Sequence, residues 1–485
     1  MSRTCLFPVF LLLLIASTTP AQKTNARLAD IKQSAIRDLD LNYDSYKGIA
    51  LQIWDFAELG YKEVKSSALL RETLRSNGFA IDSGVAGIPT AFVASYGSGS
   101  PVIGILAEFD ALPGLSQQAV AEKKPVEGRS SGHGCGHNLF GTASVAAAIE
   151  IRKLMEAGKF KGTIRVYGTP AEEGGSGKVY MVREGLFRDV DVVIHWHPGD
   201  DNATKYDGAL ANKSAKFRFY GVAAHAAAAP EKGRSALDAV EAMDYMVNLM
   251  REHVPSEARI HYVITSGGKA PNVVPDFAEV YYYARHPNRD EVKALFERIV
   301  KAGEGAALGT GTRMEYEIIG GTYDMLLNQE LAKFMQANLQ LVGGVNYTAE
   351  ETAFARSIQA SLGFEAPPLA TATTVKPLVK ENYPSMGSTD VGDVSWNVPT
   401  VGMSAATWVP GTPAHSWQAV ACGGMGIGTK GMMVAAKSMA LTAIDLFLQP
   451  DAIKKAKAEF EQSRGGHFRY EPLLGDRKPA LDYRD

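Results

Sequence analysis

The sequence predicts an α/β protein with a mostly parallel sheet, into which a second, α+β unit is inserted. Three short apolar runs, 101–107, 163–168 and 191–194, indicate the sheet. Continuous apolar runs of this length are typical of strands that are buried on both faces of a parallel sheet. An Ala-rich helical segment, 139–155, lies between the first two runs. The resulting strand-helix-strand alternation favours a parallel sheet.

The inserted unit is expected between residues 213 and 322. Its pattern is strand, helix, strand, strand, helix, strand, which is the ferredoxin-like order. The expected elements are strands 217–220, 259–265, 278–285 and 313–319 and helices 235–251 and 291–302. A unit of this length can fold as a domain of its own, so the α/β domain is expected to resume after it.

The α/β domain is therefore expected in two parts, 22–212 and 323–450. The first part begins with a helical pattern between Asp40 and Gly78. The second part has expected helices at 328–341 and 431–448 and loops at 383–393 and 410–417. Residues 451–485 are polar and are predicted to form a C-terminal tail that is irregular from Tyr470 onwards.

The composition argues against a nucleic-acid partner. The chain has 485 residues, of which 46% are hydrophobic and 21% charged, as expected for a globular protein of two or more domains. Its formal net charge is -3, and no run of Lys and Arg is interleaved with aromatic residues. Such a chain presents no basic groove for nucleic acid.

The first 21 residues have the layout of a secretory signal peptide. Arg3 precedes an apolar run, 6–16, and small residues end at Ala21. The run is too short to be a permanent membrane anchor. We therefore predict an exported protein, periplasmic or secreted, that starts near Gln22. Its remaining cysteines, Cys135 and Cys422, allow at most one disulfide.

Residues 132–138, Gly-His-Gly-Cys-Gly-His-Asn, predict a metal site. Thiolate and imidazole are ligands that zinc and its first-row neighbours prefer. The glycines around Cys135 leave the backbone free to turn, so that Cys135 and His137 can reach one ion. Taken alone, the segment could also be a Gly-rich loop with a buried thiol.

Further residues of ligand type follow the three predicted strands. They are Glu108 and Asp110, Glu172 and Glu173, and His195 and His197. Sites in α/β sheets form at the carboxyl ends of the strands, so these side chains are expected to converge. Adjacent Glu side chains point in different directions, so one can bind a metal while the other acts as a general base. Alternatively, Glu172 and Glu173 could be a solvated surface pair, and a histidine of the His195 and His197 pair could be a core residue. His415, in its constrained loop, could also be structural.

Six motifs in order resemble the aminoacylase/carboxypeptidase metallopeptidase superfamily. They are His-Gly-Cys-Gly-His, Glu-Glu-Gly-Gly, His-Trp-His-Pro, Ala-Ala-His-Ala-Ala in the inserted unit, Ala-Pro-Asn-Val-Val-Pro-Asp and a late Pro-Ala-His. Within the superfamily the chain looks like the amidohydrolase branch of the indole-acetyl-amino-acid hydrolases, and most of all like the aminobenzoyl-glutamate hydrolase B-subunit group. Asn138 agrees with that group, because many other relatives have Asp after the ligand His.

The resemblance implies a metallopeptidase catalytic domain, a ferredoxin-like dimerisation (lid) domain and two divalent metal ions, which are zinc, manganese or cobalt. The implied metal ligands are Cys135, His137, Glu173, His197 and His415. His133 is left with a supporting role.

The resemblance also implies how the remaining site residues act. Glu172 is the implied catalytic acid and base, and Asp110 supports the metal ligands from behind. His225 is expected to reach the active site of the partner chain in a homodimer. Asn272 and Arg285 match positions near the polar end of a small-molecule amide substrate, although Arg285 could equally form a structural ion pair. The implied substrates are N-acyl amino acids, aminobenzoyl-glutamate-like conjugates or dipeptides.

Two other functions are alternatives. A non-catalytic exported protein could bind a metal or another ligand on the same scaffold, but it has no need of Glu172 beside Glu173. A serine or cysteine hydrolase would work without metal, but no Gly-x-Ser-x-Gly surrounds Ser388 or Ser416. A dinucleotide site at the Gly-x-Gly-x-x-Gly of 426–431 is disfavoured, because the acidic residue that follows lies in the same predicted helix.

Overall fold

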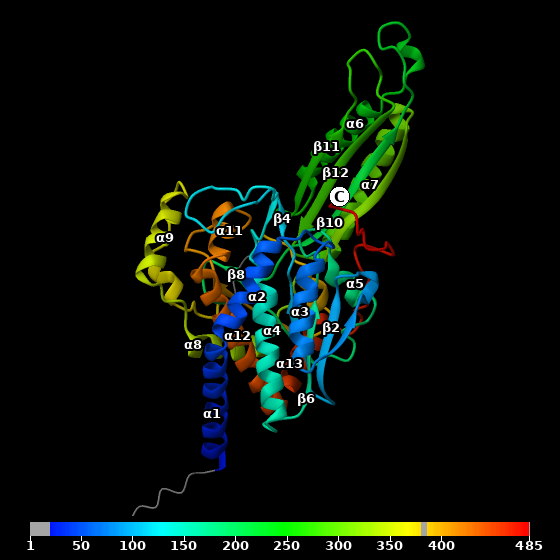
Figure 1. Cartoon of the computed structure of the whole chain (residues 1–485). Helices are drawn as coiled ribbons and strands as arrows, with labels where there is room; N and C mark the ends of the chain where they lie inside the picture. Colours follow the sequence, from blue (N-terminus) through cyan, green and yellow to red (C-terminus); the bar gives the residue numbers. More distant parts are fainter. Residues whose placement is uncertain (1–19, 380–385, 485) are drawn as a thin grey trace, which may run out of the picture.

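The computed structural model describes residues 20–379 and 386–484 (Figure 1). The predicted signal peptide, 1–21, lies outside these residues except for its last two. Strands of the α/β domain are β1 (Ala80–Ser83), β2 (Phe92–Ser98), β3 (Val102–Ala107), β6 (Gly162–Gly168), β7 (Val192–Ile194), β8 (His197–Gly199), β9 (Ala203–Lys205) and β14 (Thr400–Ala406), with a separate pair of β4 (Leu112–Pro113) and β5 (Ser131–Gly132).

Helices surround this sheet. They are α1 (Pro20–Leu41), α2 (Tyr43–Phe56), α3 (Val64–Ser76), α4 (His137–Glu156), α5 (Gly177–Arg183), α8 (Gln329–Val342), α9 (Ala349–Ala360), α10 (Val391–Ser395), α11 (Trp417–Gly423), α12 (Gly426–Leu448) and α13 (Pro450–Arg464). Because α4 contacts β3 and β6 and α12 contacts β14, helices from both parts of the chain pack on one sheet.

The remaining elements form the inserted domain. They are β10 (Ala211–Tyr220), α6 (Ala236–Met250), β11 (Arg259–Ser266), β12 (Phe277–His286), α7 (Arg289–Thr310) and β13 (Arg313–Thr322). This domain extends from the α/β domain as an arm, and the C-terminal segment returns to the foot of its sheet (Figure 1).

Two separate sheets confirm the predicted fold class. The larger sheet has the order β1-β2-β6-β3-β7-β14-β8, with β9 paired to β14. Its neighbours from β6 to β8 are parallel, whereas β1, β2 and β9 pair antiparallel. The smaller sheet is antiparallel in the order β11-β12-β10-β13, which is the ferredoxin-like arrangement.

The structure corrects the sequence-based expectations in three places. The predicted loop 383–393 ends in a helix, since α10 begins at Val391. The helix expected from 431 begins at Gly426, so the Gly-x-Gly-x-x-Gly motif is itself helical and forms no phosphate-binding turn. β14 was not predicted, although all its residues are buried.

One helix of the described residues, α12, is long and apolar enough to cross a membrane by length and composition. Of its most apolar window, 89% is buried inside the protein. This helix packs against α4, α8 and β14, which makes it part of the core.

The close approach of β6 and β2 requires a glycine at position 168. Gly168 lies opposite Phe92, and a Cβ at this glycine would lie 2.1 Å from the Phe92 ring. Phe92 is fully buried and stacks on Phe109, so its ring has no free space to move into. By contrast, a Cβ at Gly48 in α2 would meet no atom within 4 Å.

Gly168→Ala should therefore lower the free energy of unfolding by roughly 1–3 kcal/mol, the usual cost of overpacking a core. The matched variant Gly48→Ala should raise it by about 0.5–1 kcal/mol, because alanine is the better helix former. Urea unfolding followed by circular dichroism measures both. Equal midpoints for Gly168→Ala and the unaltered chain would contradict the packing described.

Candidate metal centre

Side chains from separate strand ends and loops converge on a cavity of about 660 Å³ between the two sheets. Potential ligand atoms form three overlapping groups there, and within each group the atoms all lie within 4.8 Å of one another. The groups are Cys135, His137 and His197; Cys135, Glu173 and His415; and Glu108, His137 and Glu172. All five ligands expected from the sequence are among them.

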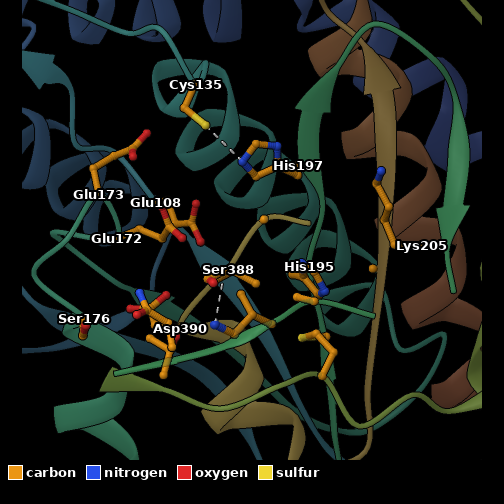
Figure 2. A pocket seen from close by; sticks show the side chains of 18 of the residues that line it. Glu108, Cys135, Glu172, Glu173, Ser176, His195, His197, Lys205, Ser388 and Asp390 are labelled. Carbon is orange, nitrogen blue, oxygen red and sulfur yellow. Dashed lines mark hydrogen bonds between the residues drawn. The ribbon is translucent and has the colours of Figure 1, made fainter. Parts of the chain in front are cut away.

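The turn before α4 brings the thiol and the imidazole together. Gly136 has φ 74°, and a Cβ there would lie 2.7 Å from Pro198, so the position requires glycine. His137 is the first residue of α4. Cys135 Sγ lies 3.4 Å from Nε2 of His197, toward which it points in Figure 2. The turn thus brings the side chains of Cys135 and His137 into one group of potential ligand atoms.

The ring nitrogens of two of the three candidate ligand histidines are oriented by oxygen atoms behind them. Nδ1 of His197 lies 2.7 Å from the carbonyl oxygen of Pro198, and Nδ1 of His137 lies 2.9 Å from Asp110 Oδ1. An Nδ1–H that donates to such an oxygen leaves Nε2 directed at the cluster. Asp110 therefore lies behind a candidate ligand histidine, where it can orient the ring.

The cluster is built to hold positive charge. Burial opposes a charge on His137, yet the carboxylates of Glu108 and Asp110 raise the pKa of His137 well above its usual range. Nε2 of His137 lies 3.1 Å from Glu108 Oε2, and Nε2 of His415 lies 3.3 Å from Glu173 Oε1. A cation bound between these atoms would balance the same carboxylate charges that a proton on the imidazole balances.

The donor atoms fit a divalent metal. Three buried atoms, Glu108 Oε2, His137 Nε2 and Glu173 Oε1, lie in the ion-pair contacts just described but make no well-directed hydrogen bond among the described residues. Buried polar atoms are rarely left in this state unless a ligand or ion completes them. Thiolate, imidazole and carboxylate together suit zinc and its first-row neighbours.

Cys135 is poorly suited to act as a nucleophile without metal. Burial first, and then the nearby Glu173, raise the pKa of the Cys135 thiol well above its usual range. The thiolate is the reactive form of cysteine, and these surroundings disfavour it. This environment argues against the metal-free cysteine hydrolase.

The loop that carries Glu172 and Glu173 is held under backbone strain. Ala171 and Ser176, at its two ends, have φ 56° and 59°. Non-glycine residues in this region cost energy and are concentrated at functional sites. The backbone N–H of Glu173 donates to Asp110 Oδ2 at 2.9 Å. The carboxylate of Asp110 therefore positions two candidate ligands, His137 and Glu173, which come from different segments.

Glu172 has the electrostatics of a group that exchanges a proton. Burial first, and then the charges of Glu108 and Glu173, raise the pKa of Glu172 well above its usual range. Carboxyl groups with raised pKa values in a cleft are typical of general acids and bases. Glu172 faces the same space as Glu108 in Figure 2.

A buried ion-pair network beneath Glu108 was not predicted from the sequence. Lys178 Nζ lies 2.6 Å from Glu108 Oε1 and 2.7 Å from Asp390 Oδ1, and all three side chains are buried. This network turns the other oxygen of Glu108 toward His137. Lys178 in α5 belongs to no recognisable motif, so its role could not be predicted. For Asp390, the polar triplet 388–390 was the sequence signal that could have pointed to a functional residue.

The other histidines near the cluster have different roles. His133 Nε2 lies 3.0 Å from the carbonyl oxygen of Ile53, and burial lowers the pKa of His133 to about 3, so the ring is neutral and structural. His195 lines the cavity, but it is not part of the three groups of potential ligands. Of the His195 and His197 pair, one member therefore faces the cluster.

The predicted residues of the inserted domain lie in two places. Arg285 lines the cavity of its own chain. His225 and Asn272 are exposed and adjacent, since the backbone N–H of Ala226 donates to the Asn272 carbonyl oxygen at 3.0 Å. Neither of them is among the described residues that line the cavity.

Known proteins resemble this chain in sequence and in fold. The model of peptidase family M20/M25/M40 matches residues 104–419. The chain is 42% identical over 449 residues to the B-subunit of p-aminobenzoyl-glutamate hydrolase from Escherichia coli (strain K12), covering 87% of this chain and 93% of that protein. It is 29% identical over 457 residues to the Xaa-Arg dipeptidase of Mus musculus, covering 91% and 95%.

Solved structures show the same fold. One is a dinuclear metal binding peptidase of the M20 family from Bacillus subtilis, with TM-score 0.58 and 16% identity over 84% of this chain and 99% of that one. Another is an aminobenzoyl-glutamate utilization protein from Klebsiella pneumoniae, with TM-score 0.60 and 17% identity over 86% and 99%. With this fold, this site and these relatives, the chain belongs to peptidase family M20/M25/M40.

Proposed function

We propose that this hydrolase is a metal-dependent amidohydrolase that uses two divalent ions and Glu172 to cleave a linear amide bond. The observation that carries the proposal is the overlap of the two ligand groups that share Cys135, next to the third group, which contains Glu172. Cys135 belongs to the group with His197 and to the group with Glu173 and His415, so it can serve two adjacent ions. When bound, such ions lower the pKa of water and polarise a carbonyl group.

Glu172 performs the proton transfers in this proposal. It takes a proton from the attacking water and returns it to the nitrogen of the leaving amine. Surroundings that raise the pKa of Glu172 favour its protonated form between these two steps. Lys178 and Asp390 keep Glu108 oriented, and Asp110 keeps His137 and Glu173 oriented, so the reacting groups are held in place beforehand.

The relatives support an amide substrate with a nearby carboxylate. The Escherichia coli relative is called a p-aminobenzoyl-glutamate hydrolase and the mouse relative an Xaa-Arg dipeptidase. Arg285 in the cavity is suited to bind a carboxylate. The proposed substrates are aminobenzoyl-glutamate-like conjugates, N-acyl amino acids or dipeptides. The proposed ions are zinc, which the thiol and imidazoles favour, or manganese or cobalt.

A homodimer through the inserted domain is part of the proposal. β11 is an edge strand, and its side chains Tyr262, Val263 and Ile264 are 37%, 55% and 40% exposed. An exposed apolar edge is a template for pairing with another chain. His225 and Asn272 lie outside their own cavity, and we assign them to the partner's site, with His225 as a hydrogen-bond donor to the developing oxyanion.

Glu172→Gln should lower kcat at least about 100-fold while the bound metal per chain stays the same, because the general base is lost and the ligands are not. The measurement is the hydrolysis rate of 4-aminobenzoyl-glutamate together with elemental analysis. Glu127→Gln, on an exposed loop, is the matched control. Persistent activity in Glu172→Gln would remove the proposed mechanism.

His225→Ala should lower kcat roughly 100-fold or more, the usual effect of removing an oxyanion donor. If His225 acts in the partner's site, mixing the inactive His225→Ala and Glu172→Gln chains should recover activity. Each mixed dimer then contains one site with both groups intact. Failure of the mixture to recover activity, with mixed dimers confirmed by native mass spectrometry, would place His225 elsewhere.

Export is a further part of the proposal. It rests on the layout of residues 1–21 and predicts that the mature chain begins near Gln22. N-terminal sequencing of the protein from cell fractions tests it. A chain that retains Met1 and remains with the cytosolic fraction would contradict it.

A further inference from the structure

The C-terminal segment runs along both domains and ends at the cavity. It is anchored at several points. Tyr470 Oη donates to Asp393 at 2.8 Å, and Leu473 and Leu474 are each 2% exposed. Arg183 donates to the carbonyl oxygens of Gly475 and Arg477, and Arg477 itself donates to the carbonyl oxygen of Ile319 at 2.7 Å. Since Arg183 belongs to the α/β domain and Ile319 to the inserted domain, the segment is fixed against both. Its end is therefore placed by packing.

Arg484 enters the cavity from this segment. Its Nη2 donates to the carbonyl oxygen of Glu173 at 2.5 Å, and its guanidinium lies 4.8 Å from the Tyr483 ring centroid. The Nε of Arg484 is buried and has no hydrogen-bond partner in the described part of the chain, and no carboxylate there pairs with this guanidinium. The guanidinium of Arg484 thus lines the cavity without an ion-pair partner among the described residues.

Arg285 is a second guanidinium in the same condition. It lies 5.3 Å from the ring centroid of Tyr283, and its buried Nε also lacks a partner among the described residues. Tyr281, Tyr283 and Arg285 alternate along β12, so they share one face of the sheet. Tyr283, Arg285 and Arg484 all line the same cavity.

Unused hydrogen-bonding atoms surround the two arginines. Asn212 lies opposite both Arg285 and Thr322 on the neighbouring strands. Asn212 Oδ1 and Thr322 Oγ1 are buried without a partner among the described residues, and both side chains line the cavity. Lys205, the other cationic side chain there, is far from Glu173 in Figure 2. The foot of the inserted sheet is therefore a polar subsite of its own.

We propose that Arg484 and Arg285 form a two-guanidinium subsite that selects substrates whose amino-acid part carries two carboxylates, an acyl-glutamate or acyl-aspartate. The inference rests on the amide hydrolysis proposed above. Half-buried guanidinium groups without counter-charges are costly unless a ligand supplies the charge. Carboxylates bind guanidinium groups through paired hydrogen bonds, which fit two arginines to a dicarboxylate.

The test compares 4-aminobenzoyl-glutamate with 4-aminobenzoyl-glutamine, which differ in one charge and little in size, on the metal-loaded full chain. Arg484→Ala should raise KM for the glutamate conjugate by about 10- to 100-fold, the usual worth of a charge-assisted contact, and leave kcat and the glutamine conjugate nearly unchanged. Arg484→Lys should retain part of the preference. Arg469→Ala removes an exposed arginine of the same segment and should change neither value.

Arg484 also contacts the loop of Glu173, so a positioning role has to be separated from recognition. Tyr483→Phe removes the hydroxyl that donates to Glu173 O at 3.2 Å and keeps the guanidinium. If Arg484 recognises the substrate, Tyr483→Phe should preserve the preference for the glutamate conjugate. If Arg484→Ala and Tyr483→Phe instead lower kcat alike for both conjugates, the subsite is overturned and Arg484 only holds the loop.

Failure of the proposed reaction would have a different result. A metal-loaded wild-type chain that hydrolyses neither conjugate overturns amide hydrolysis of this class. Calorimetric titration with the glutamate conjugate then still tests the subsite, because Arg484→Ala should weaken binding by the same factor. Equal affinities for wild type and Arg484→Ala would overturn it.

Discussion

Buried negative charge at the carboxyl ends of the central strands is the constraint on which the site depends. Lys178 bridges Glu108 and Asp390, and the imidazole of His137 lies between Glu108 and Asp110. Carboxylates can be buried only with such partners. Glu172 and Glu173 lie at the cavity wall without a lysine or arginine ion-pair partner among the described residues, and the proposed metal ions would balance their charge.

The backbone around this charge is held in conformations that the chain would not adopt alone. Ala171, Ser176 and His415 all have positive φ, and each lies in a loop that presents a group of the cluster. Neighbours oppose this strain: Tyr61 Oη donates to Gly175 O at 2.6 Å, and Gly134 accepts from the backbone N–H of His415 at 2.9 Å. Such over-determined loops hold reacting groups in place before a substrate arrives.

Much of the fold and the convergence of the candidate ligands could be predicted from the sequence, because the signals are local. The apolar runs of β3 and β6 show their burial directly, and a turn with Cys135 between glycines shows its chemistry. β14 was missed because Thr-Val-Gly-Met-Ser-Ala-Ala mixes small polar residues into a buried strand. Lys178 and Asp390 meet only through the tertiary fold. Arg484 lies in a polar segment without periodicity, so its place at the cavity could not be foreseen.

Removing and restoring divalent ions is the most direct test of whether bound cations balance the carboxylates of this site. The full chain would be treated with chelator, dialysed, and titrated with zinc or manganese while hydrolysis and bound metal are measured together. Activity should be absent without metal and should return in proportion to bound ions, up to two per chain. A chain shown by elemental analysis to be free of metal, yet hydrolysing at the original rate, would contradict metal-dependent catalysis.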